Sequence, residues 1–404
     1  MTPALSMSPR LRRARGFSMV ELLVSVAIGM LALTFAVRTV ASSEKSRETQ
    51  LGGSDSMQNG MVALFSISGD AGEAGFGLND SILSGCDTKF TDRGQYALAT
   101  GPAIQGATPT TPLAPVVIES NGSAPDRISF YAGSSSAGTA TLRVTANYVN
   151  GAQISVDRVP YGFSQGDVIV VAPEQVGGRC ALAQLSGNPR DLLPPPGPQY
   201  INVAEGTGYR YNTGNLGVAF TGGAARLFNL GRPEDLSFHT WSVADGFLKL
   251  RSTDLQGASA SPTTVTDNIV SIKAQYGFDT RTGTAFLPQG GISVMRWSST
   301  MIDADGDGTI GNGVDWQHVA AVRLAVVARS KAVERVAAGA SCTSTPEKPQ
   351  VFKTQTPQNV TAVPITVDVA VAGDPNDWKC YRYRVFETVV NLRNAGWRPE
   401  AWKN

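Results

Sequence analysis

The residues best suited to chemistry are the carboxylates of one short acidic loop. Asp303, Asp305 and Asp307 stand at alternate positions of the sequence DADGDGTI, residues 303–310. Ca²⁺ binds about six to eight oxygen atoms, and its loops place Asp at positions 1, 3 and 5, Gly at 6 and a backbone carbonyl at 7. Here Gly308 and Thr309 occupy the last two positions.

The ligand that would close this loop is displaced by one residue. Position 12, usually a glutamate, is Val314, and Asp315 follows it. We predict a structural Ca²⁺ site made of the three aspartates above, the carbonyl of Thr309, and Asp315, without the flanking helices of an EF-hand. The alternative is a solvated Asp-Gly turn between two strands.

Cysteine is the second chemically informative residue type. The chain has four: Cys86, Cys180, Cys342 and Cys380. Four cysteines can pair in three ways, and proximity along the sequence favours Cys86 with Cys180 and Cys342 with Cys380. The alternative is four buried free thiols. The absence of any CxxC spacing disfavours a zinc site or a redox pair.

The sequence GFSQG, residues 162–166, has the form of a nucleophile elbow around Ser164. That motif needs a strand before it and a helix after it. The residues that follow, GDVIVVA, have the composition of a strand, and no spacing ties the serine to His239 or His318. We interpret the motif as a turn and predict no enzymatic activity.

The composition narrows the class of protein. The chain has 404 residues, 34 Lys and Arg against 33 Asp and Glu, only 2 His, and 43 Gly. A net charge of +1 with no long basic stripe gives nucleic acid no obvious binding surface. Low charge with many small residues is typical of an extracytoplasmic β-rich protein rather than a cytosolic α/β enzyme.

The N-terminus carries a membrane signal. Four arginines, at positions 10, 12, 13 and 15, precede an apolar run at residues 17–37 whose one ionisable side chain is Glu21. As a helix these 21 residues extend about 31 Å, enough to cross a bilayer. The positive-inside rule keeps the arginines in the cytoplasm and places everything after Arg38 on the other side.

The sequence RGFSMVELLVSVAIGMLAL resembles the class III leader of type IV pilins and pseudopilins. The resemblance implies that a prepilin peptidase cuts after Gly16 and methylates the new amine of Phe17. It also implies that Glu21, the fifth mature residue, pairs with the terminal amine of a neighbouring subunit during assembly.

The physical chemistry of Glu21 agrees with that role. A carboxylate inside an apolar spanning segment costs up to about 3 kcal/mol near the bilayer centre, so it needs a partner. Four residues after Phe17, it lies one helical turn from the new amine, near the positive end of the helix dipole. The alternative is an ordinary signal anchor with a tolerated Glu.

The remaining residues predict an α+β fold: a long pilin-like N-terminal helix followed by a large antiparallel β-rich region. We expect a leader at residues 1–16, a transmembrane half-helix at 17–38, an amphipathic half-helix at 39–76 and the β-rich region at 77–404. Gly52, Gly53 and Gly60 make a kink or local unwinding plausible. A Pro-rich stretch suggests two lobes dividing near residues 190–235. The clearest strand patterns lie at residues 128–132, 141–149, 168–172, 247–251, 269–278, 320–329, 367–372 and 381–392.

Several of these segments resemble the PilW branch of minor pilins. The matching residues are 124–131, 166–185, 265–279, 319–330 and 380–394, in that order along the chain. The resemblance implies a minor pilin that takes part in priming the pilus near its tip. Its partners would be prepilin peptidase, other minor pilins and the major pilin. It would start as a single-pass protein of the bacterial inner membrane, with a periplasmic domain, and move to the pilus and cell surface.

Two other functions fit the same sequence. A minor pseudopilin of a type II secretion system has the same leader, and genomic neighbours would distinguish the two. A membrane-anchored adhesin or binding module would instead use the β-rich region to hold a host or environmental ligand.

Overall fold

The computed structural model describes residues 18–103, 108–134, 141–189, 199–286, 291–334, 336 and 339–394, apart from the side chains of residues 45–52. It contains two compact units, Met1–Gly53 and Ser54–Asn404. The predicted cleavage site at Gly16 and Phe17 lies outside the described residues.

One long helix, α1 (Met19–Glu73), begins the described chain. The assignment is continuous through Gly52, Gly53 and Gly60, so the expected local unwinding does not occur. Gly60 has a packing role instead, because a Cβ there would overlap the ring of Phe386. The helix ends at Glu73 rather than at residue 76, and Gly75 and Gly77 follow with φ angles of +84° and +73°, which favour glycine.

Within the second unit, one face of α1 is buried. Its buried positions recur every three to four residues, the period of a helix. They are Ser56, Gly60, Ala63, Ile67 and Ala71. All but Ile67 are small residues, which allow the helix to approach the sheets closely.

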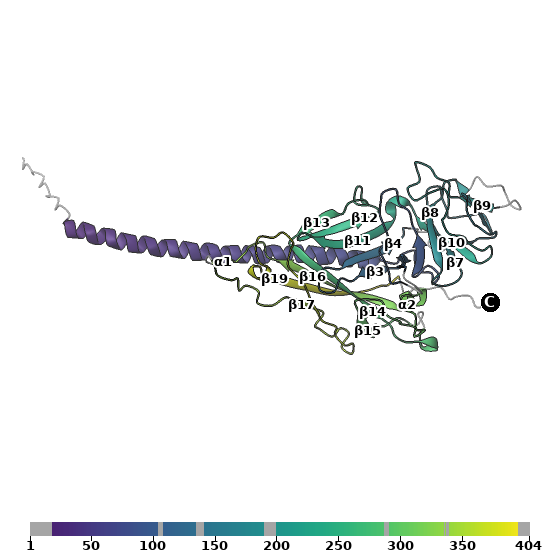
Figure 1. Cartoon of the computed structure of the whole chain (residues 1–404). Helices are drawn as coiled ribbons and strands as arrows, with labels where there is room; N and C mark the ends of the chain where they lie inside the picture. The colour runs from purple at the N-terminus through teal and green to yellow at the C-terminus, as the bar shows by residue number, and fades with distance from the viewer. Residues whose placement is uncertain are drawn as a thin grey trace, which may run out of the picture. The chain divides into compact units, whose positions relative to one another are not determined.

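Two sheets, α1 and one face of a third sheet enclose the main core. The strands of the five-stranded antiparallel sheet, in spatial order, are β13 (Thr263–Asp267), β12 (Phe247–Ser252), β11 (Ser237–Ala244), β4 (Arg127–Ala132) and β3 (Val116–Glu119). Those of the four-stranded antiparallel sheet are β15 (Arg296–Ser298), β14 (Ile269–Phe278), β16 (Val319–Arg329) and β19 (Tyr383–Asn391). Figure 1 shows these strands along the C-terminal part of α1.

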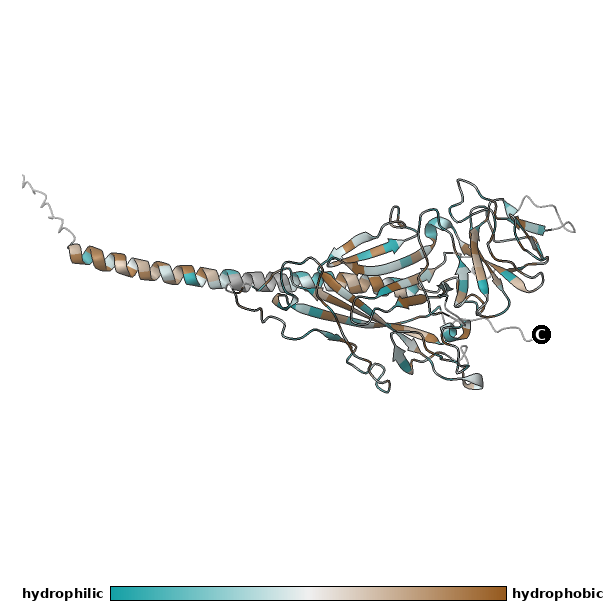
Figure 2. Ribbon diagram, viewed as in Figure 1, coloured by the Kyte–Doolittle hydropathy of each residue, from teal (hydrophilic) through white to brown (hydrophobic). Residues whose placement is uncertain are grey.

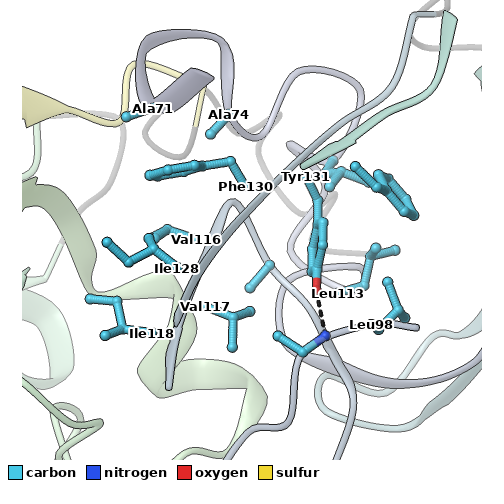
Figure 3. Packing of buried hydrophobic residues seen from close by; sticks show 14 of the residues in the cluster. Ala71, Ala74, Leu98, Leu113, Val116, Val117, Ile118, Ile128, Phe130 and Tyr131 are labelled. Carbon is cyan, nitrogen blue, oxygen red and sulfur yellow. Dashed lines mark hydrogen bonds between the residues drawn. The ribbon is translucent and has the colours of Figure 1, made fainter. Parts of the chain in front are cut away.

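The core between them is mainly apolar, and several of the polar groups in it are hydrogen-bonded. Figure 3 shows Ala71 and Ala74 close to the ring of Phe130, with Ile128 and Tyr131 on the same strand. The Tyr131 hydroxyl accepts a hydrogen bond of 2.7 Å from the backbone N–H of Ala99. The buried phenol therefore keeps a partner, as buried polar groups require.

A third sheet has six strands. In spatial order these are β2 (Pro112–Leu113), β1 (Cys86–Lys89), β8 (Arg179–Gln184), β7 (Val168–Pro173), β10 (Ala225–Gly231) and β5 (Thr141–Arg143). The pair β1 and β8 is parallel, an exception to the antiparallel pattern that the sequence predicts. One face covers a second core, together with the hairpin of β6 (Gln153–Val156) and β9 (Gln199–Asn202).

The second core changes the predicted division of the β-rich region. Strands on both sides of residues 190–235 share the five-stranded sheet, in which β3 and β4 join β11, β12 and β13, so the described strands are not grouped into lobes at that point. All members of the second core lie between Leu142 and Leu227. Because β4 pairs directly with β11, this core belongs to an excursion of the chain between those two strands.

The remaining elements are short. They are α2 (Gly313–Gln317), β17 (Gln350–Val351), β18 (Ile365–Thr366) and the 3₁₀ helices η2 (Pro233–Asp235), η3 (Gly283–Ala285) and η5 (Trp378–Cys380).

Two strand predictions are wrong in extent. Of residues 141–149 only the first three form β5, and residues 367–372 form no strand although Val367 and Val369 are buried. These two valines lie in a loop and pack in an apolar cluster with residues of β14 and β16, and an alternating pattern alone does not distinguish such a loop from a strand.

The structure contains the two disulfides that sequence proximity favours. Cys86 bonds to Cys180, which joins β1 to β8, and Cys342 bonds to Cys380. The second bond closes the base of the long connection between β16 and β19.

Candidate functional site

The first part of α1 has the properties of a membrane span. From Met19 to Glu44 its most apolar 18-residue window has a mean hydropathy of 2.3, and none of that window is buried. The large apolar side chains at positions 19–40 are mostly exposed, and Figure 2 shows them as a hydrophobic stretch. By length and composition this segment is able to cross a bilayer.

Glu21 lies in the first turn of this helix. The backbone N–H groups of a first turn have no acceptor within the helix, so a carboxylate is favoured there. The structure therefore places the one acidic residue of the apolar segment at the end next to the predicted cleavage site.

The acidic loop between β15 and α2 brings three carboxylates together. Oxygen atoms of Asp303, Asp305 and Asp315 all lie within 4.8 Å of one another. Asp315 is buried and comes from the first turn of α2. Three carboxylates at this spacing suit a hard cation, which prefers oxygen ligands.

Backbone N–H groups orient these carboxylates. Asp303 accepts hydrogen bonds from Gly306 and Gly308, at 2.8 and 2.9 Å. Asp315 accepts from Ala304 at 2.6 Å and from Gly311 at 2.7 Å. The backbone that holds Asp303 and the backbone that holds Asp315 therefore bring these two carboxylates close together.

Asn312 contacts two of the loop's predicted ligands. The Asp307 carboxylate accepts from the backbone N–H of Thr309 at 2.7 Å and from Asn312 at 2.8 Å, and it is not part of the three-carboxylate group. The Thr309 carbonyl accepts a long hydrogen bond of 3.4 Å from the Asn312 side chain. Asn312 also caps α2, so it links the glycine-rich turn to the helix.

The loop's electrostatics are those of crowded carboxylates. Burial raises the pKa of Asp315 to about 6, with the charge of Asp305 as a further cause. Burial and the charges of Asp307 and Asp303 raise the pKa of Asp305. A divalent cation would relieve this repulsion, because it favours the ionised forms.

The loop is fixed against the rest of the β-rich unit. The ring of Trp316 occupies the space that a side chain at Gly85 would fill, next to Cys86. Gly313 packs against the backbone of Gly177 in the turn between β7 and β8. The acidic loop thus joins the four-stranded sheet to the six-stranded one.

A charged cluster that the sequence did not reveal lies where α1 meets β11. The His239 Nδ1 atom is 2.8 Å from the carboxylate of Asp70 on α1, and its Nε2 atom is 2.9 Å from Asp254. Asp70 also accepts a hydrogen bond of 2.6 Å from the indole of Trp241. Burial alone would lower the pKa of His239, but the two carboxylates raise it to about 9.

A second buried pair was also missed. The side chains of Lys273 on β14 and Asp126 have no solvent exposure, and they form an ion pair. The lysine inside the apolar strand IVSIKAQYGF could have indicated such a pair, since lysine is almost never fully buried unless paired.

Ser164 lies in a turn, in agreement with the interpretation of GFSQG. Gly162 and Gly166 have φ angles of +85° and +92°, and the backbone N–H of Ser164 donates to Asp167. The strand β7 follows, where a nucleophile elbow would need a helix.

Comparisons with known proteins match both ends of the chain. Residues 11–37 match the prokaryotic N-terminal methylation motif, and residues 240–394 match the family of type IV pilus-assembly protein W. No curated protein matches. A type IV-like pilin from Thermus thermophilus is similar at 14% identity, over 40% of this chain and 70% of that chain, with a TM-score of 0.22.

The two family matches cover the apolar helix start and the strands from β11 to β19. With its prepilin methylation motif, its apolar N-terminal helix and a β-rich domain whose later strands match the PilW family, the chain is similar to PilW-type pilins.

Proposed function

We propose that this chain is a minor pilin that takes part in the priming and assembly of a type IV pilus, near its tip. The proposal is supported by the presence of both a methylation motif and a PilW match on the same chain. In this proposal the precursor resides in the inner membrane through α1, with its β-rich region in the periplasm. Prepilin peptidase then releases it, and α1 packs among the helices of other minor pilins and the major pilin.

The chain's role in this process is structural rather than catalytic. Glu21 pairs with the methylated amine of a neighbouring subunit, and that pairing removes the cost of a lone carboxylate among apolar helices. The turn that contains Ser164 is followed by the strand β7 and not by a helix, so it supports no role for Ser164 as a nucleophile.

Processing gives the first test. The chain recovered from its native membrane is expected to begin at a methylated Phe17, as measured by intact mass and by the N-terminal peptide. Gly16→Val is expected to leave residues 1–16 attached, because a side chain there obstructs the peptidase. Gly29→Ala is the matched control, since a Cβ at that exposed position meets nothing within 4 Å.

A second variant separates processing from assembly. Glu21→Gln is expected to be cut and methylated normally but to leave cells with few pili. Normal pili together with lost protein secretion would instead make the chain a type II pseudopilin. Normal pili with lost attachment to a surface would favour the adhesin.

We also propose that the acidic loop binds Ca²⁺ through Asp303, Asp305 and Asp315, with the Thr309 carbonyl and Asp307 completing the shell after a small rearrangement. What supports it is the cluster of three carboxylates within 4.8 Å. The cation would be structural and would fix α2 against the turn between β7 and β8.

Removal of Ca²⁺ is expected to lower the melting temperature of the full chain in detergent. A ligand at about 100 times its Kd stabilises the folded state by about 2.7 kcal/mol, so the shift is several degrees. Asp305→Asn is expected to abolish the difference between Ca²⁺ and EGTA. Asp235→Asn, at an exposed position on η2, should preserve it. Identical melting curves with and without Ca²⁺ in the unaltered chain would refute the site.

A further inference from the structure

The strand β19, at one edge of the four-stranded sheet, differs from the other edge strands of the protein. It has nine residues and pairs with β16 at every one of them, without a bulge. Figure 1 shows it as the yellow strand beside β16. The other edge strands that the structure describes have two to five residues, and the pairing of β13, the longest of them, contains a register shift. Short or bulged edges prevent pairing with other chains, and β19 lacks both protections.

Half of the backbone groups of β19 point away from the sheet. Just beyond the strand, the backbone N–H of Leu392 donates to the carbonyl of Ala320, the residue that leads into β16. Bonding alternates along an antiparallel pair, so the even-numbered residues of β19 bond to β16 and the odd-numbered ones face away. The outward groups in the middle of the strand are therefore those of Val385, Glu387 and Val389.

These outward groups lie at the surface. Among the residues that the structure describes, none forms a hydrogen bond with the backbone of Val385, Glu387 or Val389 on this side. Val385 is 38% exposed. Glu387 is exposed as a residue although its side chain is only 28% exposed, so much of that exposure belongs to its backbone. A row of N–H and C=O groups at every second residue is matched by the backbone of another extended strand.

The charge around this edge is positive and unbalanced. Arg382, Arg384 and Arg393 are exposed, and none of them forms an ion pair with another described residue. The acidic residue of the strand is already engaged, because Glu387 accepts hydrogen bonds from the backbone of Phe352 at 2.6 Å and from Arg323 at 3.4 Å. Opposite charges on neighbouring strands stabilise their pairing, so an added strand with Asp or Glu side chains suits this edge.

A second copy of the same strand would not supply those carboxylates. Glu387 is the one acidic residue between Tyr383 and Asn391, and its side chain is held by Arg323. Two β19 strands side by side would also bring the exposed arginines of both copies to the same edge. The charges therefore favour a strand from a different protein.

We propose that the outward edge of β19 is a docking site for an extended, acidic segment of another protein, which adds a fifth strand to the four-stranded sheet. Its backbone bonds to Val385, Glu387 and Val389, and its carboxylates pair with the exposed arginines at the two ends of β19. The added strand displaces no described residue. The inference is independent of the pilus role proposed above.

The first test measures hydrogen exchange in the unaltered full chain in detergent, with a nine-residue peptide of alternating Val and Glu as the probe. Saturating peptide is expected to slow exchange at the amides of Val385, Glu387 and Val389 at least tenfold. The amides of Phe386 and Thr388 already bond to β16, so their exchange should slow less than threefold. Slowing of neither set, or equal slowing of both, would overturn the proposal.

The second test concerns charge and uses the same peptide with a fluorescent label. A peptide of alternating Val and Lys is expected to bind at least tenfold more weakly. Arg384→Gln is expected to weaken binding of the Val and Glu peptide about threefold. Arg296→Gln is the matched control, because this exposed arginine lies on β15, at the opposite edge of the same sheet. Equal affinity for the two peptides would overturn the acidic partner.

The third test removes one outward donor. Val385→Pro deletes an N–H that does not bond to β16, and proline is tolerated at such positions of an edge strand. This variant is expected to bind the Val and Glu peptide at least tenfold more weakly than Val385→Thr, which keeps the N–H. Equal affinity of the two variants would contradict strand addition. The exchange measurement needs no variant, so it decides the proposal if Val385→Pro does not fold.

Sedimentation in detergent tests whether a second copy occupies the edge instead. The unaltered chain and Val385→Pro are expected to have the same oligomeric state. A dimer that Val385→Pro abolishes would make a second copy the occupant and would overturn the proposed acidic partner.

Discussion

Replacement of Lys273 by Met is expected to lower the free energy of unfolding by about 3–5 kcal/mol. The Lys273 ammonium donates to the carbonyls of Gly122 and Ala124, at 2.9 and 3.0 Å, as well as to the Asp126 carboxylate. Both side chains are fully buried. Without the lysine, Asp126 becomes a buried charge with no counter-ion.

The size of the effect follows from that stranded carboxylate rather than from the attraction itself. Asp126 also accepts from the backbone of Asn121 and Ala274, at 2.9 and 3.0 Å, so it fixes the turn before β4 against β14. Protonation would remove its charge but weaken those two bonds. Whether Asp126 stays charged or becomes protonated, the contact between the turn before β4 and β14 loses stability.

Urea unfolding of the full chain in detergent, followed by tryptophan fluorescence, measures the loss. Lys331→Met, at an exposed position, should change the free energy of unfolding by less than about 0.5 kcal/mol. The double variant Lys273→Met with Asp126→Leu is expected to recover part of the loss, because no charge is then stranded. A double variant less stable than the single one would contradict this account.

Features encoded over a few residues were predictable from the sequence. The membrane span, the length of β14 and the turn at Ser164 all follow from local periodicity or spacing. The acidic loop was partly predictable. Asp303, Asp305 and Asp315 lie together, whereas the side chain of Asn312 engages Asp307.

Features that depend on long-range pairing were not predictable. Asp70 and His239 are separated by 169 residues, and nothing in either local sequence pairs them. The second core, formed by the chain between β4 and β11, was not predicted for the same reason, because strand pairing is not a property of one segment. Val367 and Val369 alternate as a strand would, yet they lie in a loop that packs against the four-stranded sheet.

A rise in pH from about 6.5 to 9 is expected to destabilise the protein by about 3 kcal/mol through His239. Hydrogen bonds with Asp254 and Asp70 outweigh burial and raise the folded-state pKa of His239 to about 9, above its ordinary value of 6.5. The folded state therefore holds a proton that the unfolded state releases. This stabilisation is complete below pH 6.5 and is lost as the pH passes 9.

At acidic pH the cluster has the opposite effect: stability falls as the pH is lowered. Burial alone would raise the pKa of Asp254, but hydrogen bonds from His239 and Ser252 lower it below its ordinary value. Its contribution is present above a pH of about 4 and is lost on further acidification. The cluster is thus most stabilising between about pH 4 and 6.5.

Melting temperature measured against pH tests both limbs. His239→Gln keeps a polar side chain without the titration, so its profile is expected to be nearly flat between pH 6.5 and 9. Asp70→Asn still accepts from Trp241 but removes one carboxylate, so the alkaline loss should begin at lower pH. Since Asp70 lies on α1 and His239 on β11, the same limb should appear as faster hydrogen exchange in residues 54–73. An alkaline loss that persists in His239→Gln would assign the effect to another group.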